Sequence, residues 1–100
     1  MLEKVKKALR VATDAFDDEL LDLIASAVAD IRVIGAVFTA DEIKTEGEVT
    51  DYDIPDPLIR QAVITYCKMN FGQPDNYAQL EKSYWEQKAQ LRENSDYGPK

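Results

Sequence analysis

Few residues of this sequence could do covalent or metal chemistry. Its 100 residues include one cysteine, Cys67, and no histidine. Histidine is the commonest general base and, together with cysteine, supplies most transition-metal ligands. Cys67 lies on the apolar side of a predicted helix, where we expect a buried and unreactive thiol. The sequence therefore predicts no catalytic residue, no metal site and no cofactor, and it does not indicate an enzyme.

The carboxylates offer the other chemistry to be considered. Residues 41–56 contain seven acidic side chains and one lysine. Asp51 and Asp53 alternate as in a calcium-binding EF-hand loop, but the glycine and the distal glutamate of that loop are missing. A pair of carboxylates for glycoside hydrolysis would need a cleft, which a helical chain of this length rarely encloses. We interpret these residues as an acidic surface.

The net charge of −7 is distributed unevenly, because the first ten residues are basic and the rest of the chain is strongly acidic. We interpret the N-terminal cations as a solvated helix face, with contact to an acidic neighbour as the alternative. These cations are Lys4, Lys6, Lys7 and Arg10. An acidic protein repels nucleic acid, so specific DNA binding is disfavoured, although DNA could slide past such a surface. We expect no membrane contact, because no apolar run approaches the length of a membrane span.

Apolar periodicity predicts the helices that must position these residues. The four predicted helices cover residues 2–12, 17–34, 56–72 and 75–92. The fold class is therefore all-α. We expect a small four-helix domain over residues 1–93, with a long acidic loop between the second and third helices and a flexible C-terminal tail over residues 94–100.

The third helix has the clearest boundaries. Asp56 occupies the N-cap position, Pro57 the first helical position, and Gly72 the left-handed position that ends a helix. Apolar residues cover more than half of its circumference, so we expect this helix to be central. For the second helix, Asp14 or Asp17 is the predicted cap.

Residues 36–55 are the least determined part of the sequence. The apolar run 36–38 is a candidate strand, or an anchor beneath the loop that follows it, and residues 48–54 could pair with it as a small hairpin. The density of acidic residues nevertheless favours a mobile acidic loop. A loop of this length in a small domain is usually functional or flexible.

Candidate interface residues come from three places. On the fourth helix, the stripe that includes Tyr84 can dock onto its own domain, whereas Trp85 lies on a second stripe without an obvious partner. Trp85 is therefore either a half-buried core aromatic or an interface anchor. On the third helix a side stripe contacts another helix or another subunit, and the acidic segment 41–56 is the third place. The candidates are Trp85, Lys88, Arg92, Ile64, Phe71, Asp51 and Asp53.

Several sequence features follow one another in a recognisable order. They are Leu9-Arg10; Asp17-Asp18-Glu19-Leu20-Leu21 with Ile24, Ala27, Ile31 and Gly35; Asp56-Pro57-Leu58-Ile59-Arg60-Gln61-Ala62-Val63 with Tyr66, Phe71 and Gly72; and Tyr77, Leu80, Ser83-Tyr84 and Leu91. In this order and spacing they resemble the small helical head–tail connector proteins of long-tailed phages, also called head-completion or adaptor proteins. The likeness covers residues 5–92 except 36–55.

This resemblance implies a four-helix fold whose copies form a ring beneath the portal at the DNA exit vertex of the capsid. It implies a structural role in completing the DNA-filled head after DNA packaging and in presenting a platform for tail attachment. The implied partners are further copies of the chain, the portal protein, and head-closure or tail proteins. DNA would pass through the channel without specific binding. The implied location is the head–tail junction of the virion, after assembly in the host cytoplasm.

A ring needs two different and complementary patches on each copy. We expect the Trp85 stripe, with Lys88 and Arg92, to meet the acidic segment 41–56 of the next copy. Two other classes of function stay open. One is a small helical regulatory module that binds another protein, as an antitoxin does. The other is an acidic DNA mimic, which needs carboxylates at a regular, phosphate-like spacing over a rigid surface.

Overall fold

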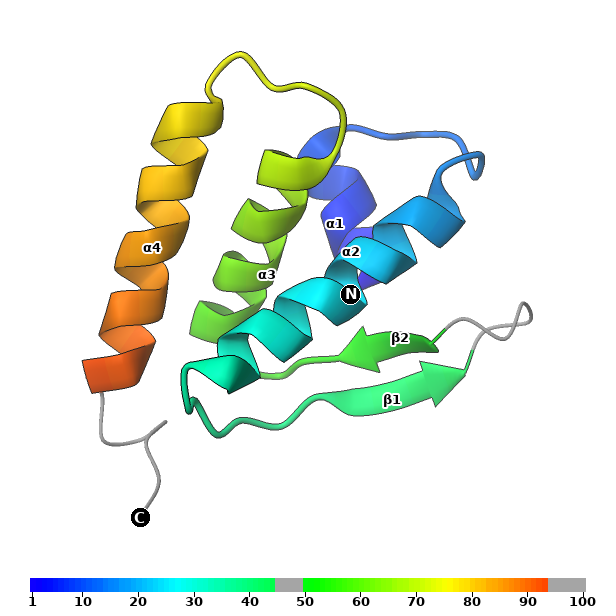
Figure 1. The fold of residues 1–100 in the computed structure, drawn as a ribbon. Helices are drawn as coiled ribbons and strands as arrows, with labels where there is room; N and C mark the ends of the chain where they lie inside the picture. Colours follow the sequence, from blue (N-terminus) through cyan, green and yellow to red (C-terminus); the bar gives the residue numbers. More distant parts are fainter. Residues whose placement is uncertain (45–49, 94–100) are drawn as a thin grey trace.

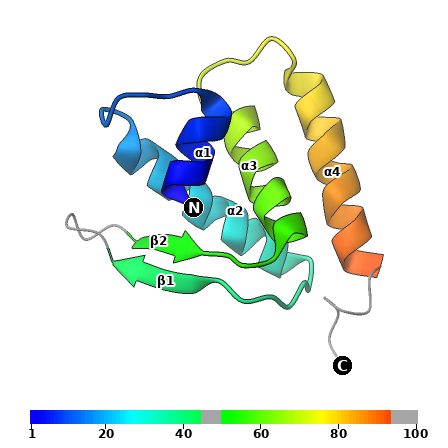
Figure 2. The same cartoon turned by 180° about the vertical axis from the view of Figure 1, so that it is seen from behind.

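Helix α3 lies at the centre of the fold, between α4 on one side and α1 and α2 on the other (Figures 1 and 2). The computed structural model describes residues 1–44 and 50–93. In this part of the chain the elements are α1 (Leu2–Leu9), α2 (Asp17–Val33), β1 (Asp41–Lys44), β2 (Thr50–Asp53), α3 (Pro57–Asn70) and α4 (Tyr77–Glu93). Both strands lie across one end of the helical layer, with β2 against α2. The predicted four helices are confirmed, and a small sheet accompanies them.

The boundaries of α3 are the ones that the sequence predicts. The Asp56 carboxylate accepts hydrogen bonds from the backbone amides of Leu58 and Ile59 at 2.8 and 3.3 Å, and Pro57 takes the first helical position. After the helix, Gly72 has a φ of +68°, in the left-handed region that favours glycine. The fully buried residues of α3 are Ile59, Ala62, Val63 and Cys67. The predicted central helix and buried thiol are therefore confirmed.

Helix α2 buries its predicted apolar arc but begins differently from the prediction. Its buried residues are Leu20, Leu21, Ile24, Ala27, Val28 and Ile31. The N-cap residue is Phe16, and no side chain caps the helix. The carboxylates of Asp14 and Asp17 instead each lie 2.9 Å from Nζ of Lys6. The predicted aspartate cap is wrong, because a tertiary contact to α1 takes both side chains.

Helix α1 is shorter than predicted and ends at Leu9 instead of residue 12. It ends there because Arg10 adopts the left-handed conformation, with φ +59° and ψ +39°. The prediction of a solvated basic face is correct for Lys4, Lys7 and Arg10, which are exposed. It is wrong for Lys6, whose side chain is buried where it bridges the two aspartates.

A β-hairpin replaces the irregular acidic loop predicted between α2 and α3. Strands β1 and β2 are antiparallel, with Asp41 directly opposite Asp53. The loop prediction is therefore wrong for the residues of both strands, and residues 45–49 lie outside the described chain. The alternative hairpin had the wrong partner strand, because Ala36 and Phe38 pack against the core outside the described sheet.

Contacts to the N-terminus hold β2 in place and explain why an acidic segment forms a sheet. The N-terminal amine of Met1 donates a hydrogen bond to the carbonyl of Tyr52 at 2.8 Å and lies 3.4 Å from the Asp51 carboxylate. The backbone amide of Leu2 donates to both oxygens of Asp51, at 3.1 and 3.2 Å. Ile54, directly after β2, is buried. Asp51 therefore caps the start of α1 from a distant strand.

Helix α4 docks on α3 through the stripe that the sequence predicts for this purpose. Tyr84 and Leu91 are buried, and the Tyr84 ring meets the ring of Tyr66 on α3 at a centroid distance of 5.4 Å. Leu80 is half-buried against the core, whereas Tyr77 at the start of the helix is exposed. Because this stripe faces α3, the side of α4 that carries Trp85 is exposed.

Candidate interaction surface

Trp85 on α4 is the most exposed aromatic residue of the described chain, with 60% of its surface accessible. A groove of about 320 Å³ lies beside it. The groove is lined in part by Ala89 and Arg92 of α4 and by Ile34, which directly follows α2. We call Trp85, Ala89, Arg92 and Ile34 the Trp85 surface. Its exposed indole corresponds to the interface alternative of the sequence analysis, and the core alternative does not fit the observed exposure.

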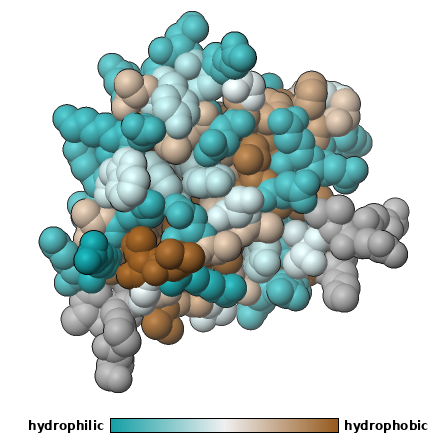
Figure 3. Space-filling model, in the orientation of Figure 1, coloured by the Kyte–Doolittle hydropathy of each residue, from teal (hydrophilic) through white to brown (hydrophobic). Residues whose placement is uncertain are grey.

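Further apolar side chains are exposed at the end of α2. Val33 is 82% exposed and Val37 is 63% exposed. Figure 3 shows apolar atoms gathered at the lower left of the molecule, where α2 ends beside α4 in Figure 1. Sequence reasoning missed these two valines, although Val33 falls outside the buried arc of α2. Clustered apolar residues on a surface are typical of protein interfaces.

Lys88 lies next to Trp85 in the helix but is buried and paired within the fold. Its Nζ is 3.1 Å from Oδ2 of Asp30 on α2 and 3.9 Å from the centroid of the Trp85 ring. The hydroxyl of Tyr84 donates to the same Asp30 oxygen at 2.6 Å. The sequence predicts Lys88 to be a cation available to a partner. The structure shows that its charge instead links α4 to α2.

The polar contacts around Asp30 favour the charged form of its carboxyl group. Burial alone would raise the pKa of the Asp30 carboxyl, but the hydrogen bonds from Tyr84 and Lys88 outweigh it and hold that pKa below its usual range. Burial and the hydrogen bond to Asp30 raise the pKa of the Tyr84 hydroxyl. Asp30 thus holds Nζ of Lys88 against the face of the Trp85 ring. This cation–π contact orients the indole before any partner arrives.

The two other apolar candidates do not join the Trp85 surface. Ile64 and Phe71 are half-buried and pack against the core. Phe71 also meets Phe16, before α2, in an edge-to-face contact with 5.4 Å between the ring centroids. Figure 1 shows that α3 ends at the opposite end of the molecule from the end of α4. These residues therefore belong to a separate region.

The two acidic candidates have different environments although they are two residues apart. Asp51 is half-buried and bonded to the start of α1, as described above. Asp53 is exposed, and so are Asp41 and Glu42 on β1. Asp53 is therefore part of an acidic surface, whereas Asp51 contributes mainly to the fold.

The structure offers little chemistry beyond contact surfaces. In residues 1–44 and 50–93, no three Cys, Asp or Glu side chains are grouped so that they could hold a metal ion. Burial raises the pKa of the Cys67 thiol to about 12. No helix in the same residues is long and apolar enough to cross a membrane. The arrangement can bind other surfaces through an indole, exposed valines and charged side chains.

Comparison with known proteins adds one match. A family model described as "Phage connector protein" matches residues 1–98, nearly the whole chain. Comparisons with curated proteins and with solved structures gave no significant match.

Proposed function

Because this chain belongs to the phage connector protein family, which has a structural role at the head–tail junction of the virion, we propose that it is a ring-forming adaptor. Copies of the chain form a ring beneath the portal, complete the DNA-filled head and provide the platform for tail attachment. The family match over residues 1–98 is the observation that carries this proposal. Such a structural role requires no catalytic residue.

The Trp85 surface supplies the contact that this function needs. An exposed, pre-oriented tryptophan beside a groove is the type of anchor that dominates binding energies in protein interfaces. Because Lys88 is paired with Asp30, the groove presents apolar groups together with one cation, Arg92, and one anion, Glu93. This chemistry fits an acidic hairpin less well than the sequence analysis expected. We therefore assign the Trp85 surface to the portal, and the ring contact to other residues.

The acidic charge fits a position beside moving DNA. The chain has a net charge of −7, and Glu42 is exposed on the hairpin. Carboxylates at a channel wall repel phosphates, so DNA would pass without adhering. The structure does not favour the DNA-mimic alternative, because Asp51 shares a strand face with Asp53 but is bonded to the start of α1 and is not free to imitate a phosphate.

Substitution of the indole tests the assignment of the Trp85 surface. Trp85→Ala should weaken binding to the portal protein of the same phage at least about tenfold, since tryptophan hot spots contribute about 2 kcal/mol or more. Folding should change little, because the side chain is 60% exposed. Binding can be measured by surface plasmon resonance and folding by thermal unfolding.

Tyr77→Ala is the matched control, because Tyr77 is another exposed aromatic residue on α4 but lies two turns away from Trp85. It should leave portal binding unchanged. Equal losses in both variants, or unfolding of Trp85→Ala, would contradict the assignment.

A further inference from the structure

One side of α1 carries cations that have no partner in the described chain. Lys4, Lys7 and Arg10 are exposed, and within residues 1–44 and 50–93 none of their side chains is hydrogen-bonded or ion-paired. Lys6 differs, because Asp14 and Asp17 satisfy its charge. We call Lys4, Lys7 and Arg10 the α1 basic face. Its cations are available to an external anion.

The backbone at Arg10 gives a second, independent observation. Its φ of +59° lies in the left-handed region, where glycine is the usual residue at the end of a helix. An arginine here is unfavourable for the backbone, and within the described residues its side chain makes no hydrogen bond or ion pair that would compensate. Residues in unfavourable backbone conformations cluster at functional sites, so this position supports a role for the Arg10 side chain.

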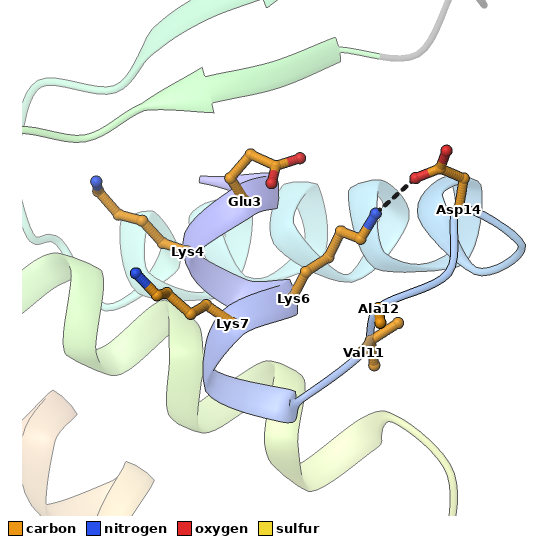
Figure 4. Close-up of a pocket in the computed structure, with 7 residues that line it drawn as sticks. All are labelled: Glu3, Lys4, Lys6, Lys7, Val11, Ala12 and Asp14. Carbon is orange, nitrogen blue, oxygen red and sulfur yellow. Dashed lines mark hydrogen bonds and ion pairs between the residues drawn. The ribbon is translucent and has the colours of Figure 1, made fainter.

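The α1 basic face borders a hollow of about 610 Å³ (Figure 4). Lys4 and Lys7 extend to one side of it, whereas Lys6 points to Asp14 (Figure 4). Its lining residues are Glu3, Lys4, Lys6, Lys7, Val11, Ala12 and Asp14. The apolar side chains of Val11 and Ala12 make this surface suitable for a partner that combines acidic and apolar groups.

The outer side of the hairpin has that combination and carries an unfavourable pair of charges. Asp41 and Asp53 are directly opposite each other on β1 and β2, so their side chains share one face of the sheet. Like charges in this arrangement repel each other. Ile43, two residues along β1, shares the face and is 48% exposed. We call Asp41, Asp53 and Ile43 the hairpin acidic face.

We propose that the α1 basic face of one copy binds the hairpin acidic face of a second copy, with Ile43 directed to Val11 and Ala12. A neighbouring lysine or arginine would relieve the repulsion between Asp41 and Asp53. The two faces are different patches, as head-to-tail assembly of identical subunits requires. This inference rests on the proposed ring and identifies the surfaces that form it.

Cross-linking between two variants that each carry one added cysteine tests this contact. Lys7→Cys and Asp53→Cys each add one exposed thiol, while Cys67 stays buried. The two variants are mixed, assembled with the portal protein and treated with a short thiol cross-linker. The pair should form a cross-linked dimer. The control pair is Lys82→Cys with Asp53→Cys. Lys82 is also an exposed lysine, but it lies on α4, outside the proposed contact, so this pair should form no cross-linked dimer.

Charge reversal provides a second test by sedimentation velocity of the free and portal-bound protein. Lys7→Glu and Asp53→Lys should each weaken self-association about tenfold, and the double variant should recover most of the loss. The controls Lys82→Glu and Asp22→Lys make the same changes of charge at other exposed positions. Association of the original protein should also weaken as salt rises from about 0.05 to about 0.5 M.

Several outcomes would overturn the contact. They are the absence of a Lys7→Cys/Asp53→Cys dimer on the portal, a double charge-reversal variant that associates as weakly as the single variants, and equal losses of association in the controls.

Two other outcomes would assign the α1 basic face to a different partner. A cross-link from Lys7→Cys to the portal would assign it to the portal, and loss of duplex DNA binding as the only effect of Lys7→Glu would assign it to DNA. If the original protein binds the portal protein but the variants do not cross-link, this inference alone is rejected. If the original protein does not bind the portal protein, the proposed function is rejected.

Discussion

Individual side chains on α4 that are neighbours in sequence have opposite environments. Trp85 is exposed, whereas Tyr84 and Lys88 are buried and converge on one oxygen of Asp30. Helical periodicity predicts that Trp85 lies away from the docking stripe. It does not predict the Asp30 contacts, because those residues are more than 50 positions apart. Such pairing depends on how α2 and α4 are placed in the fold.

The depressed pKa of Asp30 predicts a dependence of stability on pH. A carboxyl whose pKa is lower in the folded state stabilises the fold above its ordinary value of 3.8 and loses this contribution as the pH falls through the folded value. At pH 7, Asp30→Asn should reduce the free energy of unfolding by about 0.5–1 kcal/mol, after allowance for solvent screening. The difference should shrink as the pH falls below 3.8 and the Asp30 carboxyl takes up its proton in the folded protein. Urea unfolding across this range measures it, and a difference that stays constant with pH would refute the prediction.

Arg10 predicts a stabilising substitution. Arg10→Gly relieves the left-handed backbone, which costs a residue with a Cβ atom about 1 kcal/mol, while glycine gives the unfolded chain more freedom. We expect a net gain of about 0.5 kcal/mol in the free energy of unfolding. The control Lys7→Gly, inside α1, should lose about 1 kcal/mol. Chemical denaturation compares them, and a loss of stability in Arg10→Gly would show that its side chain supports the monomer.

Among the elements, α1 and the hairpin depend on each other. Met1 has no side-chain cap for α1, and the Asp51 carboxylate from β2 takes that place. Asp51→Ala should lower the free energy of unfolding by about 1 kcal/mol and increase hydrogen exchange in α1. Asp53→Ala removes one of two repelling charges, so it should leave stability unchanged or slightly higher. Equal losses in the two variants would contradict this distinction.

The elements also differ in how well the sequence predicts them. The start and end of α3 follow from Asp56, Pro57 and Gly72, whose effects are local. The hairpin does not, because acidic residues are poor strand formers and its position depends on contacts with the N-terminus. The length of α1 was also missed, since Arg10 adopts a conformation that its residue type disfavours.

For the whole molecule, the distribution of surfaces matters more than any pocket. The Trp85 surface and the exposed valines lie along the second half of α4 and at the end of α2. The α1 basic face lies on and directly after α1, and the hairpin acidic face lies on β1 and β2. The candidate sites could be predicted in part: Trp85, Arg92 and Asp53 are exposed, but Lys88 and Asp51 are engaged within the fold. A chain with several separate contact surfaces suits a subunit that meets different neighbours.

The central claim is that surface left uncovered by this small fold is covered by the portal and by further copies of the chain. Native mass spectrometry of the purified protein mixed with its portal protein tests this most directly. We predict a complex that holds several copies of the chain on one portal ring, and free protein in place of that complex when Trp85→Ala is used. Original protein that stays unbound in the presence of the portal would contradict the account.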